Sequence, residues 1–271
     1  MKLGLMRSRS QSELKKRFNE TAQSAASIVK REHPHLVGIL IHGSVARGEP
    51  GPFSDIDMEA VTESGKKKPS EYSYFDGDIY VGVGFSSVTD LEKEFTDPKA
   101  FFWARGSAKA TILLYDPKGI LRKIMLRWKK TKPSHQLLQK SLWDAYHNII
   151  EYSGKLRNGW LKHDEYLTRY SARVLAQHIE TAIIALNDLS VISENYVWHQ
   201  ILKAKKRPRH IGTDYPLALG IKGTRDASKV YRSTMRLCRE TLRLIRDEFE
   251  EEAKHVRFKA LLAEPLEKHG L

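Results

Sequence analysis

The feature that most constrains this chain is a pair of adjoining segments near its start. An apolar run over residues 36–41 has the length and β-branched content of a buried strand. A Gly43-Ser44 step follows it, and then a loop rich in glycine and proline. In the next strand, residues 54–61, apolar side chains alternate with acids, so one face is apolar and the other acidic. The pattern predicts two sheet strands with chemistry concentrated in the turn between them.

The Gly43-Ser44 step favours a phosphate-binding turn. Glycine lets the backbone approach an anion closely, and a helix beginning at Ser44 or just after would point its N–H groups at phosphate oxygens. Arg47 is a candidate phosphate clamp because its planar donors match phosphate geometry. Gly48, Gly51 and two prolines then turn the chain into the second strand.

Asp55 and Asp57 lie two residues apart in that strand, so both carboxylates project from one face. Two adjacent carboxylates repel each other and are stable only near a cation. Mg²⁺ is a suitable cation, because it takes hard oxygen ligands from one or two carboxylates and from substrate phosphates. With phosphates held at Gly43-Ser44, the metal would bridge protein and triphosphate, which is the equipment of phosphoryl transfer.

The whole pattern resembles the signature of the nucleotidyltransferase superfamily, typified by DNA polymerase β and by kanamycin nucleotidyltransferase. The matching positions are a hydrophobic strand followed by Gly43, Ser44, Gly48, Ser54, Asp55, Ile56, Asp57 and Met58. The resemblance implies transfer of a nucleoside monophosphate from an NTP such as ATP to an acceptor hydroxyl, with release of pyrophosphate. It implies one or two Mg²⁺ ions on Asp55 and Asp57, and adds Gly48 and Ser54 to the nucleotide-binding residues.

A third acid is usual in this family on a later strand, yet the run Ile79–Phe85 has Gly82 where the acid is expected. Asp78 has the same parity as Gly82 and is the candidate substitute. In kanamycin-type enzymes a glutamate of the helical domain acts as the base, which makes Glu180 a second candidate. The alternative for Glu180 is a salt bridge with an Arg or Lys of the bundle.

The order of elements predicts an α+β chain in which a small mixed-sheet nucleotidyltransferase domain precedes an all-α helical bundle. We expect the α/β domain over residues 1–126, a basic linker over 127–135 and the bundle over 136–271. Helices are predicted over 12–32, 89–96, 136–160, 164–189 and 226–252, and strands over 72–75, 79–85 and 110–115 as well. This arrangement resembles the kanamycin-type branch of the superfamily, although this resemblance is looser than that of the motif. In that branch two subunits can complete one site, so we also include a homodimer among the expectations.

Composition limits the setting of the reaction. The chain has a formal net charge of +13 and a single cysteine, and no apolar run approaches the length of a membrane span. We expect a cytoplasmic protein with polyanionic partners and no membrane association. Only 11 Asn plus Gln residues accompany its many charges, a skew typical of thermophile proteins. The basic segments 127–132 and 203–210 are interpreted as a linker and a solvated loop, with nucleic-acid binding as the alternative.

Three functions remain open from the sequence. The first is a Mg²⁺-dependent nucleotidyltransferase whose acceptor is RNA, a protein or a small molecule. The second is a nucleotide- or RNA-binding regulatory protein whose catalytic centre has decayed, which Gly82 and the positive charge favour. The third is an enzyme that adenylylates a protein partner, as an antitoxin does with its toxin.

Overall fold

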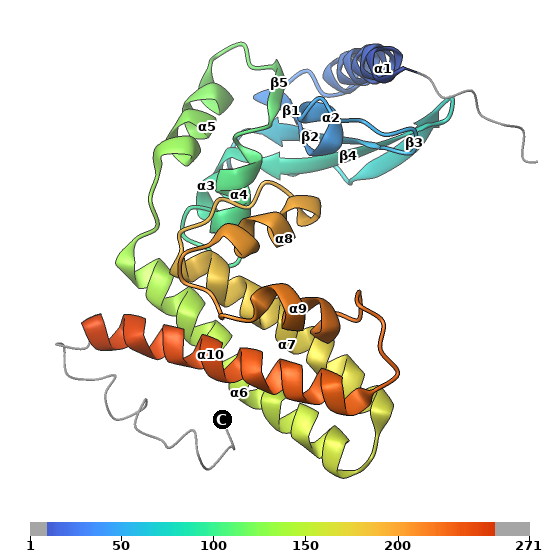
Figure 1. The fold of residues 1–271 in the computed structure, drawn as a ribbon. Helices are drawn as coiled ribbons and strands as arrows, with labels where there is room; N and C mark the ends of the chain where they lie inside the picture. Colours follow the sequence, from blue (N-terminus) through green and yellow to red (C-terminus); the bar gives the residue numbers. More distant parts are fainter. Residues whose placement is uncertain (1–9, 253–271) are drawn as a thin grey trace, which may run out of the picture. The chain divides into compact units, whose positions relative to one another are not determined.

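The computed structural model describes residues 10–252 of the chain. The chain divides into two compact units, with the boundary between Thr131 and Lys132, and each unit is described by itself. The first unit carries a five-stranded sheet and the second consists of helices (Figure 1). The α+β class predicted from the sequence is confirmed. None of the described helices is long and apolar enough to cross a membrane.

The sheet of the first unit is mixed, with the strand order β3-β4-β2-β1-β5. Strands β2 and β4 run parallel, and the other three neighbouring pairs are antiparallel. The two strands of the sequence motif, β1 and β2, are therefore adjacent in the sheet. The strands are β1 Gly38–Ile41, β2 Ile56–Thr62, β3 Tyr72–Asp76, β4 Ile79–Ser87 and β5 Ile112–Tyr115.

Helices cover both faces of the sheet. The long helix α1 (Gln11–Glu32) packs on one face, where Phe18 and Val29 are buried against Ile56 and Met58. Its N-cap is Ser10, because Ser10 and Glu13 form a reciprocal capping box. The opposite face is covered by α3 (Val88–Lys93), α4 (Phe101–Ser107) and α5 (Ile120–Lys130).

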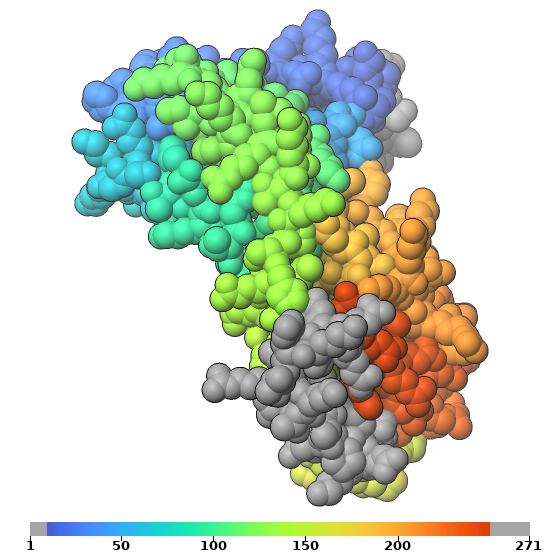
Figure 2. All heavy atoms as spheres, turned by 90° about the vertical axis from the view of Figure 1, so that its left-hand side faces the viewer, coloured from blue at the N-terminus to red at the C-terminus, as the bar shows by residue number. Residues whose placement is uncertain are grey.

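The linker predicted over residues 127–135 contains the boundary between the two units and is non-helical over residues 131–134, but it overlaps the end of α5. Residues 127–130 form the last turn of α5, and Trp128 there is 4% exposed in the core beneath the sheet. Ser134 already caps the next helix by accepting a hydrogen bond from the Leu137 N–H. In the space-filling view, α5 forms part of the surface of its unit, which is where its lysines and arginines lie (Figure 2).

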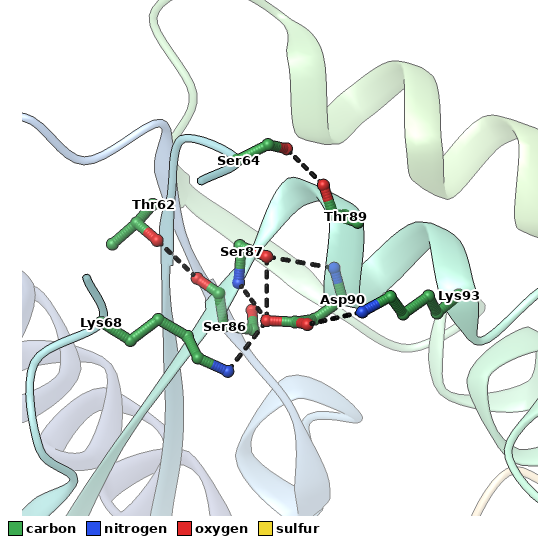
Figure 3. A network of polar contacts seen from close by, with 8 residues as sticks. All are labelled: Thr62, Ser64, Lys68, Ser86, Ser87, Thr89, Asp90 and Lys93. Atoms are coloured by element: carbon green, nitrogen blue, oxygen red, sulfur yellow. Dashed lines mark hydrogen bonds and ion pairs between the residues drawn. The ribbon is translucent and has the colours of Figure 1, made fainter. Parts of the chain in front are cut away.

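A polar network fixes the connection between β2 and β3 to the start of α3 (Figure 3). The carboxylate of Asp90 accepts hydrogen bonds from the Ser87 N–H and hydroxyl and from Lys68 Nζ, at 2.8–3.0 Å. The hydrogen bonds from Lys68 and Ser87 hold the pKa of Asp90 down at about 2. The Thr89 hydroxyl donates to the Ser64 hydroxyl at 2.6 Å. The basic connection is thus held to the sheet.

In its described part, up to residue 252, the second unit packs three long helices with two short ones. The last long helix carries a buried apolar seam, since Met235, Cys238, Leu242, Ile245 and Phe249 are each at most 4% exposed. A bidentate ion pair from Arg236 to the buried Asp214 joins the last two helices at 2.6 and 2.8 Å. The helices are α6 His135–Leu161, α7 Glu165–Leu186, α8 Glu194–Lys203, α9 Ile211–Ala218 and α10 Ala227–Glu252.

Candidate functional site

The turn between β1 and the short helix α2 (Gly43–Ala46) fits only glycine at its first position. Gly43 has φ = +72°, and a Cβ added there would lie 2.5 Å from Asp57 Oδ2. The His42 N–H donates to the Asp57 carbonyl at 2.9 Å, which ties the turn to β2. The structure therefore brings the two halves of the motif into direct contact, with the Asp57 carboxylate lying against the backbone of Gly43.

The glycine- and proline-rich loop is closed by hydroxyl hydrogen bonds. The Ser44 hydroxyl donates to Ser54 Oγ at 2.9 Å, and Ser54 Oγ also accepts from the Gly51 N–H at 2.9 Å. Gly48, with φ = +70°, turns the chain out of α2. All five predicted nucleotide-binding residues therefore lie in the one internally bonded connection between β1 and β2.

An acidic row runs along one face of β2. Asp55, Asp57 and Glu59 alternate with the buried Ile56 and Met58, as the period of a strand requires. Desolvation of the carboxylate, followed by repulsion from Asp55, raises the pKa of Asp57, while the charges of His42 and Arg47 oppose the rise. The positive charges of His42 and Arg47 therefore do not fully offset the cost of ionising the Asp57 carboxylate.

Arg47 ends α2 with its side chain 12% exposed, close enough to Asp57 to act on its pKa. Its Nε also lies 3.5 Å from Glu49 Oε2. A guanidinium so placed suits a phosphate held at the turn.

A pair formed by His42 and Glu59 extends the acidic row toward the core. The sequence pattern did not predict this pair. His42 Nε2 lies 2.8 Å from Glu59 Oε2, and its Nδ1 lies 2.9 Å from Thr111 Oγ1 and 3.1 Å from Ser107 Oγ. Burial acts to raise the pKa of Glu59, but the hydrogen bonds and charge of His42 outweigh it and the pKa is lowered.

Glu94, at the end of α3, lies beside this pair. Burial, and then the charge of Glu59, raise the pKa of Glu94 to about 7. The alternation of acids along β2 is a signal that could have identified Glu59. Glu94 and Thr111 carried no such signal, because only the packing of helices on the sheet brings them there.

On the β4 side of Asp57, two glycines leave space above the sheet. Gly82 pairs with Asp57 across β2 and β4, and Gly84 pairs with Glu59. A Cβ on either glycine would approach nothing nearer than a backbone oxygen at 3.9 Å. A hollow of about 480 Å³ lies over these positions, lined by Asp57, Glu59, Gly82, Gly84, Tyr80 and Glu71 among others.

The two candidates for the third acid have partners of their own. Asp78 lies in the β3–β4 turn, in an ion pair with Arg17 of α1 that includes a 3.0 Å hydrogen bond from Arg17 Nη1. Glu180, on α7 of the second unit, accepts a hydrogen bond from the Tyr215 hydroxyl. Its described partner is thus a tyrosine and not the Arg or Lys of the alternative interpretation. Burial raises the pKa of Glu180, partly offset by Tyr215.

Metal binding at this site would depend on few protein ligands. Within residues 10–252 no group of three or more His, Cys, Asp or Glu side chains is arranged to hold a metal ion. Asp55 and Asp57 are a two-carboxylate set, and burial, followed by the charge of Asp55, raises the pKa of Asp57. This donor set fits Mg²⁺, which completes its shell with water and substrate phosphates.

Comparison with known proteins agrees with the motif. Residues 23–98 match the family model of the nucleotidyltransferase domain, a segment that contains the turn, the acidic row and β4. The resemblance expected from the sequence is therefore confirmed for this part of the chain. No curated protein matches the chain significantly.

One solved structure is similar over most of both chains. A nucleotidyltransferase-like protein from Exiguobacterium sibiricum 255-15 superposes with a TM-score of 0.52, covering 87% of this chain and 81% of that one. The sequence identity is 11%, so this likeness concerns the fold. Its extent shows that the arrangement of a sheet unit followed by helices has a solved counterpart.

Proposed function

We propose that this protein is a Mg²⁺-dependent nucleotidyltransferase that moves a nucleoside monophosphate from an NTP to an acceptor hydroxyl and releases pyrophosphate. One observation carries the proposal. The Asp57 carboxylate lies against Gly43 at a turn suited to phosphate, two residues from Asp55, with a raised pKa that a cation would lower. A metal–triphosphate complex supplies both the cation and the anion that this arrangement requires.

The proposed roles follow from position. Gly43, Ser44, Arg47, Gly48 and Ser54 hold the triphosphate, and Asp55 and Asp57 hold one or two Mg²⁺ ions. When bound, the metal neutralises charge on the phosphates. The acceptor is RNA, a protein or a small molecule, and the reaction belongs in the cytoplasm.

Two groups remain candidates for taking the acceptor proton. Asp78 would act only if its ion pair with Arg17 opens. Glu180 is the other candidate, and burial raises its pKa, a direction that suits a general base. A homodimer that completes the site also remains a prediction.

A second candidate function is a nucleotide-binding protein without turnover. It is favoured by Gly82, which pairs with Asp57 at the position where the family's third acid is expected. Such a protein would bind NTP and metal at the same turn but transfer nothing.

The test uses ATP carrying a label on either the α- or the γ-phosphate, with Mg²⁺ and a mixture of RNA and protein acceptors. Transfer of the α-label alone is expected, because the nucleoside monophosphate moves and the γ-phosphate leaves in pyrophosphate. Asp57→Asn should lower that transfer by about a hundredfold or more. Asp76→Asn is the matched control, since it makes the same change at the exposed last residue of β3, outside the site.

Three results are informative. Transfer of the γ-label would replace this proposal with a kinase. Metal-dependent ATP binding without transfer of either label would favour the non-catalytic candidate. Equal transfer by Asp57→Asn and Asp76→Asn would remove the acidic row from the reaction.

A further inference from the structure

The basic segment of residues 204–210 connects α8 to α9 (Figure 1), and hydrogen bonds from other parts of the second unit anchor its backbone. The Asn187 side chain donates to the Lys206 carbonyl at 2.7 Å and accepts from the Lys206 N–H at 2.8 Å. Glu240 of α10 accepts from the Arg209 N–H at 2.6 Å. Ala204 and Pro208 are buried. The segment is therefore a loop after a helix with mostly exposed side chains, as expected from the sequence, and its backbone is in addition anchored at several points.

This anchoring directs the basic side chains outward. Lys203, Lys205, Arg207 and Arg209 are all exposed, with Ala204 and Pro208 buried between them. A row of cations on an ordered backbone binds a polyanion with less loss of conformational entropy than a flexible tail would.

A hollow of about 360 Å³ lies where the segment meets α10. Within the described chain, neither the Arg209 nor the Arg243 side chain forms an ion pair. The one acid present, Glu240, already accepts the Arg209 N–H. The hollow is lined by Arg207, Pro208, Arg209, His210, Glu240, Arg243 and Leu244.

We propose that this hollow binds backbone phosphates of a nucleic acid, with Arg209 and Arg243 as direct ligands. Unpaired guanidinium groups converging on one concave surface match phosphate oxygens in charge and geometry. A polymer fits better than a free phosphate, because Lys203 and Lys205 continue the row of cations beyond the hollow. The chain's net charge of +13 adds long-range attraction for such a ligand. This site is in the helical unit and does not depend on nucleotidyl transfer.

The test is fluorescence anisotropy with a labelled single-stranded RNA of about 16 nucleotides. EDTA is present so that metal-dependent binding at the acidic row makes no contribution. The Arg209→Gln, Arg243→Gln double variant keeps the anchoring bond, which uses the Arg209 backbone N–H. The matched control is Arg173→Gln, Arg232→Gln, which removes two exposed arginines of α7 and α10 that form no ion pair in the described chain. Arg232 is about 16 Å along α10 from Arg243.

The hollow variant should lose about tenfold in affinity for each arginine removed. Its plot of log K against log salt should become shallower by about 1.4, or about 0.7 for each lost contact with a single strand. The control should change neither value by a comparable amount. Arg209→Lys, Arg243→Lys should recover part of the affinity, because lysine restores the charge without the planar donors. Thermal unfolding of each variant verifies that the fold is intact.

Parallel arms identify the source of the phosphate. Duplex DNA of the same length tests whether the backbone is read irrespective of strand number, and binding of either polymer through the two arginines supports the proposal. Pyrophosphate binding that depends on the two arginines, without binding of either polymer, would overturn it in favour of a small-anion site. Equal losses in the hollow and control variants would also overturn it, because binding would then reflect diffuse charge.

Discussion

The two sides of Asp57 differ in how closely the neighbouring backbone approaches it. On the β1 side, Gly43 leaves no room, since a Cβ there would lie 2.5 Å from the carboxylate. On the β4 side, Gly82 leaves a hollow, and its nearest neighbour to a Cβ is 3.9 Å away. Glycine therefore serves opposite purposes at the two positions. The first fixes the carboxylate against the turn, and the second leaves space for a ligand.

The largest difference is expected between alanine substitutions at Gly43 and at Gly82. Gly43→Ala should cost about 2 kcal/mol of folding stability and about a hundredfold in nucleotide affinity, because it combines an unfavourable φ with displacement of Asp57. Gly82→Ala should change the stability by less than about 1 kcal/mol, because it fills open space. Urea unfolding and nucleotide titration of both variants measure the difference. Equal effects at the two positions would break the comparison.

A substitution that adds a metal-binding carboxylate tests the β4 side of Asp57. Gly82→Asp should fold and place a third carboxylate next to Asp57, because the hollow accommodates it and the two positions are paired across the strands. Affinity for Mg²⁺ should rise by about tenfold, since a third hard oxygen ligand joins the pair. Magnesium titration against Gly82→Asn separates the charge from the added volume. No gain over Gly82→Asn would show that position 82 does not face the metal.

The smallest expected effect is the pH dependence of stability caused by Glu94, which lies beside Glu59 at the end of the acidic row. The pKa of Glu94 is raised to about 7 from its ordinary value of 4.5, so the unfolded chain releases this proton first. Its contribution to stability is therefore present below about pH 4.5 and is lost as the pH rises to about 7. Glu94→Gln should remove this dependence and raise stability at about pH 8 by about 1 kcal/mol. Urea unfolding across that range, with the exposed Glu92→Gln as control, measures it, and parallel pH profiles for Glu94→Gln and the unaltered protein would contradict the assignment.

The sequence was informative where chemistry and local structure coincide. The period-two alternation of β2 and the apolar run of β1 determine both strands, and the turn residues between them carry the site. Helix α5 was missed because the basic residues at 127–130 suggested a linker, whereas burial of Trp128 beneath the sheet makes them helical. Ser10 was overlooked as a cap, although Glu13 three residues later completes its capping box.

The surroundings of the site depend on long-range packing that no local pattern encodes. Thr111 reaches His42 only because β5 pairs with β1, and Glu94 reaches Glu59 only because α3 follows β4 back onto the sheet. The anchoring of residues 204–210 likewise needs Asn187 and Glu240, which lie far away in the sequence. In both regions the charged residues are visible in the sequence, but their partners are not.

The central claim is that the turn at Gly43 and the acidic row form one metal-dependent nucleotide site. Calorimetric titration of the protein with each of the four NTPs, in Mg²⁺ and in EDTA, tests it most directly. We expect Mg²⁺-dependent binding of at least one NTP, abolished in Asp55→Asn, Asp57→Asn while the variant stays folded. Binding of no NTP, or equal binding by the variant and in EDTA, would contradict it.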